Sequence, residues 1–169
     1  MKRAERKIKN SAGFTLAEML LAVMILLMAS AIVATGIPSA RNAYEKVVLA
    51  SNAEILLSTA MNELRNELGT ATGIEVTGNV ITYTNSFTGT KSQISMSDDG
   101  IMRQRVVGMD STKARLVSEE AATGGLYVTY DSVTKKDGAV VFTGLSVKRP
   151  SSAASLTTRP TFSVRILAS

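Results

Sequence analysis

Residues 13–34 read GFTLAEMLLAVMILLMASAIVA, and Glu18 is the only charged side chain in this stretch. The segment from Phe14 to Ala34 would form a helix about 31 Å long, which matches the roughly 30 Å hydrocarbon core of a bilayer. The residues before Gly13 are polar and mostly basic. We therefore expect them to stay in the cytoplasm and the rest of the chain to lie outside.

Most of the net positive charge lies in the first thirteen residues. The 169-residue chain has 19 Lys and Arg against 14 Asp and Glu, which gives a net charge of +5. Without residues 1–13, 14 basic and 13 acidic side chains remain. The high pI therefore gives little reason to expect nucleic-acid binding by the rest of the chain, although the sequence leaves that partner open.

The composition excludes several kinds of chemistry. The chain has no cysteine and no histidine. Disulfides, thiolate nucleophiles, histidine general bases and histidine-ligated zinc are therefore excluded. We expect no cofactor, no metal site and no catalytic residue, and hence no enzyme.

Three interpretations of the apolar segment remain open from its residues alone. Ala29-Ser30-Ala31 follows an apolar run, as in a conventional secretory signal peptide that is cut after the apolar region. A permanent single-span anchor would need no cut. In the third interpretation, a leader is removed before the apolar segment, and the segment stays in the mature protein.

The run from Gly13 to Leu20 closely resembles the signature of the type IV prepilin and pseudopilin family. That signature has a glycine and then an aromatic or apolar residue. A glutamate stands at the fifth place when this aromatic or apolar residue is counted as the first. The resemblance implies that a membrane-embedded prepilin peptidase cuts between Gly13 and Phe14 and methylates the new amino terminus of Phe14. It covers about the first 35 residues strongly and the rest of the chain more loosely.

The resemblance also implies a role for Glu18 in filament assembly. The glutamate would lie only about 6 Å along the helix from Phe14, close to the membrane surface. Cleavage would create a positive amine on Phe14, and Glu18 could pair with that amine in a neighbouring subunit. The positive end of the helix dipole also favours a carboxylate at this position.

A kink or short helix break is predicted at Gly36 and Pro38, because proline removes a backbone donor and disfavours helical geometry at Ile37. A simple boundary between two helices is the alternative. Residues 36–69 should form a second, amphipathic helix that ends at Gly69. Its apolar positions recur every three or four residues; they are Ala43, Val47, Ala50, Leu57, Met61, Leu64 and Leu68, and Leu49, Ala53, Leu56 and Ala60 widen the apolar face. A core helix covered by a sheet is the favoured interpretation, and half of a coiled coil is the alternative.

Residues 70–169 should form a β-rich head, because period-two patterns and turn residues replace the helical spacing. Three hairpins are predicted around 78–79, 98–100 and 135–138, followed by a loop at 151–158 and a last strand at 161–167. Asp98 and Asp99 are interpreted as turn residues in preference to calcium ligands, because a calcium site needs six to eight oxygens. Residues 108–125 are ambiguous. The predicted fold class is α+β, with a long amino-terminal helix packed against a mainly antiparallel sheet.

The predicted organisation is a cleaved leader at 1–13, a membrane and filament-core helix at 14–35, an amphipathic helix at 36–69 and a head at 70–169. The function implied is a structural subunit, favoured as a minor one, of a type IV pilus, competence pseudopilus or type II secretion pseudopilus. Its partners would be the prepilin peptidase, other subunits and an assembly platform protein. It would sit in the cytoplasmic membrane and then in an extracytoplasmic filament. The alternative is a secreted or anchored enzyme or binding protein with a conventional signal.

Overall fold

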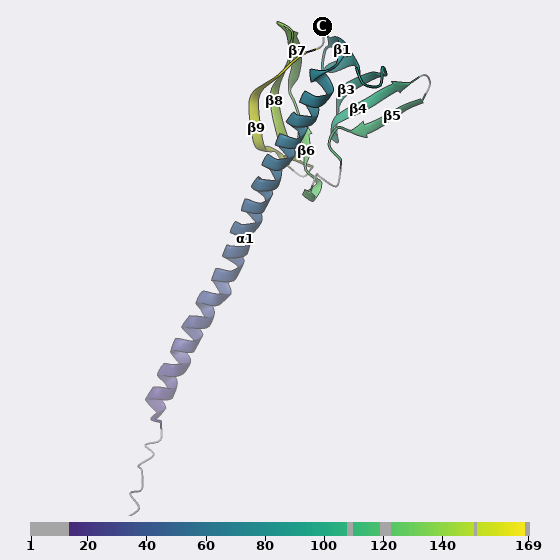
Figure 1. The fold of residues 1–169 in the computed structure, drawn as a ribbon. Helices are drawn as coiled ribbons and strands as arrows, with labels where there is room; N and C mark the ends of the chain where they lie inside the picture. The colour runs from purple at the N-terminus through teal and green to yellow at the C-terminus, as the bar shows by residue number, and fades with distance from the viewer. Residues whose placement is uncertain (1–13, 108–109, 119–122, 151, 168–169) are drawn as a thin grey trace, which may run out of the picture. The chain divides into compact units, whose positions relative to one another are not determined.

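The computed structural model describes residues 14–107, 110–118, 123–150 and 152–167. The chain divides into two compact units, residues 1–45 and 46–169. One long helix, α1 (Leu16–Gly69), contributes to both units (Figure 1). Each unit is described by itself, beginning with the amino-terminal one.

In the amino-terminal unit, α1 is helical at every residue, including Gly36 and Pro38. The short break predicted there is therefore wrong, whereas the kink predicted at this place stays a prediction. Proline removes its own hydrogen bond to the carbonyl four residues earlier, that of Ala34, and its ring crowds that carbonyl, but Ala34, Ala40 and Arg41 nearby are good helix formers. One lost bond does not end so long a helix.

Hydroxyl side chains around this proline bond to helix carbonyls. Thr35 Oγ1 donates to the carbonyls of Ala31 and Ile32 at 3.1 and 3.2 Å, and Ser39 Oγ donates to the carbonyl of Thr35 at 3.1 Å. Hydroxyl groups can satisfy backbone groups in apolar helices and often accompany proline there. These bonds reach the carbonyls of Ala31, Ile32 and Thr35 and not that of Ala34, so they do not replace the bond that Pro38 removes.

The second unit begins its β structure with a five-stranded antiparallel sheet in which each strand pairs with the next. Its strands are β1 (Thr72–Thr77), β2 (Val80–Thr84), β3 (Lys91–Ser97), β4 (Gly100–Val107) and β5 (Asp110–Arg115). The turns at 78–79 and 98–99 join β1 to β2 and β3 to β4, as predicted. The fifth strand lies in the region that the sequence leaves ambiguous.

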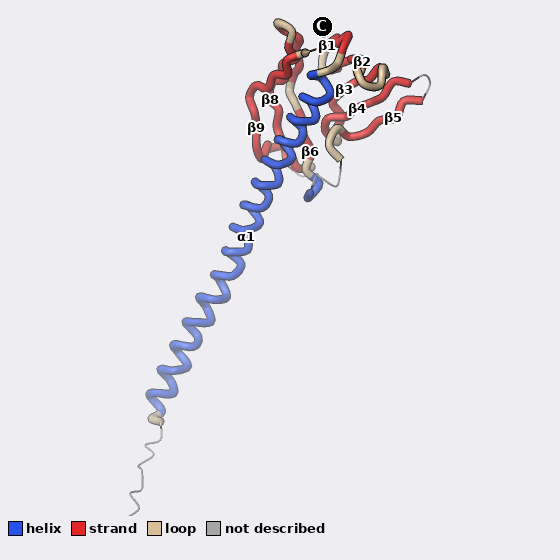
Figure 2. Tube along the Cα trace, viewed as in Figure 1, coloured by secondary structure: helices blue, strands red, loops and turns tan. Residues whose placement is uncertain are grey.

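The second sheet is built around one long strand, β8 (Ala139–Arg149), which is paired on both sides. One side pairs with β6 (Tyr127–Thr129) and β7 (Ser132–Lys136), and the other with β9 (Ser152–Arg165). A short 3₁₀ helix, η1 (Thr123–Gly125), precedes β6. Figure 2 shows the strands of both sheets around the end of the helix.

Two features of this sheet differ from the sequence prediction. The turn at 137–138 joins β7 to β8. The sequence prediction places residues 126–130 before this turn, whereas the strand in that region, β6, pairs farther along β8. The predicted loop at 151–158 is wrong for residues 152–158, which belong to β9. Serine, alanine and threonine carry no alternating apolar signal, but pairing with β8 supplies the hydrogen bonds that hold them extended.

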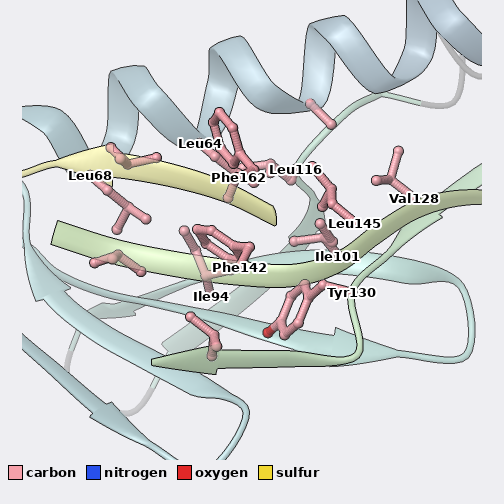
Figure 3. Packing of buried hydrophobic residues seen from close by; sticks show 14 of the residues in the cluster. Leu64, Leu68, Ile94, Ile101, Leu116, Val128, Tyr130, Phe142, Leu145 and Phe162 are labelled. Atoms are coloured by element: carbon pink, nitrogen blue, oxygen red, sulfur yellow. The ribbon is translucent and has the colours of Figure 1, made fainter. Parts of the chain in front are cut away.

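The core of the second unit lies between α1 and the two sheets. Ala53, Leu56, Leu57, Ala60, Leu64 and Leu68 form the buried stripe of the helix. Figure 3 shows the helix lying over the strands, with Leu64 and Phe162 close together and Phe142 beneath them. The rings of Phe142 and Phe162 are 6.1 Å apart, and Tyr130 meets Phe142 edge to face at 5.4 Å. The core-helix interpretation is therefore confirmed.

Three residues of the predicted apolar face, Ala43, Val47 and Ala50, are exposed, so their predicted burial is wrong. The first fully buried helix residue is Ala53. Helical spacing alone gives the direction of an apolar stripe and not the point at which a sheet begins to cover it. Ala53, Leu56 and Ala60, which should widen the predicted apolar face, are buried as expected.

Specific contacts join the two sheets at two places. Tyr130 donates its hydroxyl to the carbonyl of Asn79 at 2.6 Å, and burial raises the pKa of this phenol to about 12. Lys135 Nζ donates to the carbonyl of Ile74 at 2.9 Å. At the second place, β4 and β6 approach each other closely. A Cβ on Gly100 would lie 3.0 Å from the carbonyl oxygen of Val128, so this approach is possible only because residue 100 is glycine.

Gly144 allows β8 to pass from its pairing with β7 to its pairing with β6. Its φ is +67°, and a Cβ there would lie 1.9 Å from Asp131 Oδ2. On the other side of β8, register places Pro160 of β9 opposite Gly144, because Thr143 pairs with Thr161 and Leu145 with Arg159. Among the described strands, β9 pairs only with β8, so this proline lies in an edge strand.

We predict that Gly144→Ala strongly destabilises the head. A left-handed residue with a Cβ costs about 1–2 kcal/mol, and displacement of the Asp131 side chain should raise the total to about 3 kcal/mol or more. The measurement is urea unfolding of the full chain in detergent micelles, followed by tyrosine fluorescence.

Gly89→Ala is the matched control, because Gly89 has a similar φ of +64° and nothing lies within 4 Å of the place that a Cβ would take. It should lose only the conformational part, about 1–2 kcal/mol. Equal losses for the two variants would contradict the steric argument.

Candidate processing and assembly site

The first turn of α1 is closed by a reciprocal pair of side chains, Thr15 and Glu18. Thr15 Oγ1 accepts a hydrogen bond from the Glu18 backbone N–H at 3.3 Å, and Glu18 Oε2 accepts one from the Thr15 backbone N–H at 2.9 Å. The Thr15 hydroxyl also donates to the same carboxylate oxygen at 3.0 Å. This arrangement is a capping box, in which two otherwise unsatisfied backbone donors find acceptors.

The backbone agrees that Thr15 is the N-cap residue. Its carbonyl accepts the first helical hydrogen bond, from the Met19 N–H at 3.2 Å, and the helix begins at Leu16. Sequence reasoning names Glu18 but misses Thr15. The pattern T-x-x-E directly before an apolar run could have found it, because that spacing is the capping-box pattern.

Of the two residues that should flank the cleaved bond, the structure describes one. Gly13 lies outside the described residues. Phe14 precedes the helix, and 83% of its surface is exposed. Phe14 is therefore not part of a helical turn of α1.

The apolar part of α1 has no partner within the described chain. The large apolar side chains between Phe14 and Ile37 are 56–83% exposed. Among the described residues, α1 is the one helix long and apolar enough to cross a membrane. Exposure of so much apolar surface to water is strongly unfavourable, so this half of the helix requires lipid or another protein around it.

These residues also match a known family model. The model described as the prokaryotic N-terminal methylation motif matches residues 8–34. This amino-terminal segment is type IV prepilin-like. No curated protein and no solved structure matches the chain.

Two inferences about this pilin-like protein follow from the motif, and a third observation concerns its fold. It implies processing by a prepilin peptidase. Together with the apolar helix, it indicates anchoring in a membrane. The fold also agrees with the pilin-like α+β arrangement, with a long amino-terminal helix packed against antiparallel sheets. The roles of Gly13, Phe14 and Glu18, and of Gly36 and Pro38 within the helix, remain predictions.

Elsewhere, Asp98 and Asp99 form the β3–β4 turn, and Asp99 lies 3.6 Å from the guanidinium of Arg115. Within the described part of the chain, no three Asp, Glu, His or Cys residues are grouped closely enough to hold a metal ion. The structure therefore supplies no geometry for calcium at this turn.

We predict that Thr15→Val weakens the first turn of α1, because valine keeps the shape of threonine and loses the hydroxyl that caps the Glu18 N–H. Loss of an N-cap costs about 1 kcal/mol, so hydrogen exchange at the Glu18 amide should accelerate about fivefold. The measurement is amide exchange by NMR on the uncleaved chain in micelles.

Ser30→Ala is the control, since Ser30 Oγ donates to the carbonyl of Leu26 at 2.8 Å and caps nothing. It should leave the Glu18 amide unchanged. An unaltered Glu18 exchange rate in Thr15→Val would show that the capping box is not formed in solution.

Proposed function

We propose that this protein is a structural subunit, most simply a minor one, of a type IV pilus, competence pseudopilus or type II secretion pseudopilus. The observation that carries the proposal is the methylation motif on a helix whose apolar half has no partner within the described chain. The subunit would wait in the cytoplasmic membrane with its amino terminus inside and its head outside. An assembly platform protein would then help to transfer it into the filament.

The exposed apolar surface supports two successive environments for α1. Lipid would cover the side chains before assembly, and helices of neighbouring subunits would cover them afterwards. Such a transfer exchanges one apolar environment for another, so its net free energy depends on close packing and on polar pairs more than on the hydrophobic effect. Polar groups in this segment are few, which makes Glu18 the natural candidate for setting the register between subunits.

In the proposed mechanism, cleavage between Gly13 and Phe14 creates an amine one residue before the capping box. Glu18 Oε2 is already used by Thr15, whereas Oε1 has no hydrogen bond with any described residue. Thr15 would hold the carboxylate in place while the second oxygen receives a Phe14 amine from a neighbouring subunit. Charge-assisted hydrogen bonds of this kind are strong where water is excluded.

The minor-subunit proposal rests on features of the sequence. The chain lacks the cysteine pair that is frequent near the carboxy terminus of many major pilins. The head is also small and built mainly of simple hairpins. Retention of Glu18 argues against the kind of tip pseudopilin that lacks this acid.

Mass spectrometry of the amino-terminal peptide tests the processing step. We expect a mature chain that begins at Phe14 and carries a methyl group on its amine. A start at Ile32 would instead indicate a conventional signal peptidase that cuts after Ala29-Ser30-Ala31. A start at Met1 would indicate an uncleaved anchor, and either of these results would refute the proposal.

A second prediction separates assembly from processing. Glu18→Ala should leave cleavage largely intact, because the capping hydroxyl of Thr15 remains, and should impair incorporation into filaments. The measurement is the amount of the protein in sheared filament fractions relative to the membrane fraction.

The control is Glu45→Ala, which removes an exposed acid from the same helix, one that pairs with Arg41 at 2.9 Å. It should assemble normally. Normal incorporation of Glu18→Ala would show that the carboxylate does not guide assembly.

A further inference from the structure

The end of α1 borders an open groove that the proposed function does not use. The last turn of the helix, the loop between β2 and β3, and the end of β9 enclose about 590 Å³. We call it the helix-end groove, and its defining side chains are Arg65, Asn66, Phe87, Ser163, Arg165 and Leu167.

Two large apolar side chains are exposed at this groove. Phe87 is 83% exposed and Leu167 is 78% exposed, although both belong to the compact second unit. A single exposed apolar residue needs no explanation, but two that line one groove are typical of a binding surface. Aromatic side chains are also enriched in the central contacts of protein interfaces.

The loop that carries Phe87 is held in one conformation. The Asn85 side-chain oxygen accepts hydrogen bonds from the N–H groups of Phe87 and Thr88 at 2.9 and 3.2 Å, and the Asn85 carbonyl accepts one from Gly89 at 2.8 Å. Ser86 Oγ donates to the carbonyl of Thr70, which ties the loop to the end of α1. A partner would therefore meet a loop whose backbone is already ordered and would lose little affinity to loop ordering.

Leu167 is fixed in a similar way by its backbone. Its N–H donates to the carbonyl of Gly69 at 2.9 Å, so the end of the described chain is attached to the end of α1. The two apolar side chains are thus carried by backbone segments that both bond to the last residues of the helix. This common attachment fixes the two segments relative to each other.

The charged side chains that line the groove are all positive. Arg65 and Arg165 line it, and none of its lining residues is acidic. Neither arginine has an ion pair with a described residue. The guanidinium of Arg65 lies 5.8 Å from the centre of the Phe162 ring, which restricts its position. Arginine forks match carboxylates in geometry as well as in charge.

We propose that the helix-end groove binds an acidic peptide segment of another protein, with carboxylates on Arg65 and Arg165 and an apolar side chain against Phe87 and Leu167. Charge complementarity favours this occupant, and so do two exposed apolar side chains carried on hydrogen-bonded backbone. The proposal concerns the head alone and does not depend on how the amino terminus is processed.

The test is fluorescence anisotropy with three labelled ten-residue peptides and the full chain in micelles. One peptide alternates glutamate with leucine and phenylalanine, a second has lysine in place of each glutamate, and a third has serine in place of each apolar residue. Saturable binding of the first peptide alone is the expected result. Equal binding of all three, or binding of none, would overturn the proposal.

Variants locate the binding surface. Arg65→Glu, Arg165→Glu and Phe87→Ser should each weaken binding of the first peptide about tenfold or more. Lys136→Glu is the matched control for charge, since this exposed lysine lies at the end of β7 outside the groove, and Ile55→Ser is the control for an exposed apolar residue on α1. Loss of binding in the controls would place the site elsewhere and overturn the proposal.

Two further measurements keep the outcome clear. Because Arg65 packs over Phe162, urea unfolding of each variant shows whether a loss of binding reflects a loss of folding, and Arg165→Glu carries the charge test if Arg65→Glu is unstable. Sedimentation of the chain without peptide tests a second copy as the occupant. Self-association that Phe87→Ser abolishes would assign the groove to another copy of this chain and refute binding of a different protein.

Discussion

Burial of the leucine stripe of α1 is the contact on which the rest of the head depends. Leu57, Leu64 and Leu68 are almost fully covered by side chains from both sheets. Neither sheet could remain stable alone, because each would expose its apolar face to water. The same helix continues toward its amino terminus with an apolar surface that the described chain leaves uncovered. One element therefore provides the core of a folded domain and also a surface that needs an external partner.

The capping box adds a second constraint at the opposite end of the helix. The sequence suggests Glu18 as a partner for an amine, whereas the structure shows it bonded to its own helix through Thr15. The two roles are compatible because a carboxylate has two oxygens. An intramolecular cap would reduce the freedom that the carboxylate loses when it meets a second subunit, so the geometry favours a directed contact over a diffuse charge attraction.

Much of the fold could be predicted from the sequence, and the failures have physical reasons. Hairpins with turn residues at 78–79 and 98–100 are predicted correctly, because their turn chemistry is local. Residues 152–158 are missed, because β8 supplies their pairing and the segment carries no pattern of its own. The helix continues through Pro38, because the local cost of one proline is outweighed by the remaining turns of a long helix. At the site, Thr15 is missed although its spacing to Glu18 is visible, and the groove around Phe87 could not be predicted because it joins three distant segments.

Pro160 has a consequence for a protein that would be packed at high local concentration. The outer side of β9 presents backbone donors and acceptors, and such an edge can recruit a strand from a neighbouring molecule. A proline has no N–H to offer, and its ring interrupts the row of groups that an added strand would need. Sheet-to-sheet joining of neighbouring heads is thereby discouraged at this edge. Contacts between copies would be left to helices and side chains, so the order of a filament would not have to compete with uncontrolled β-aggregation.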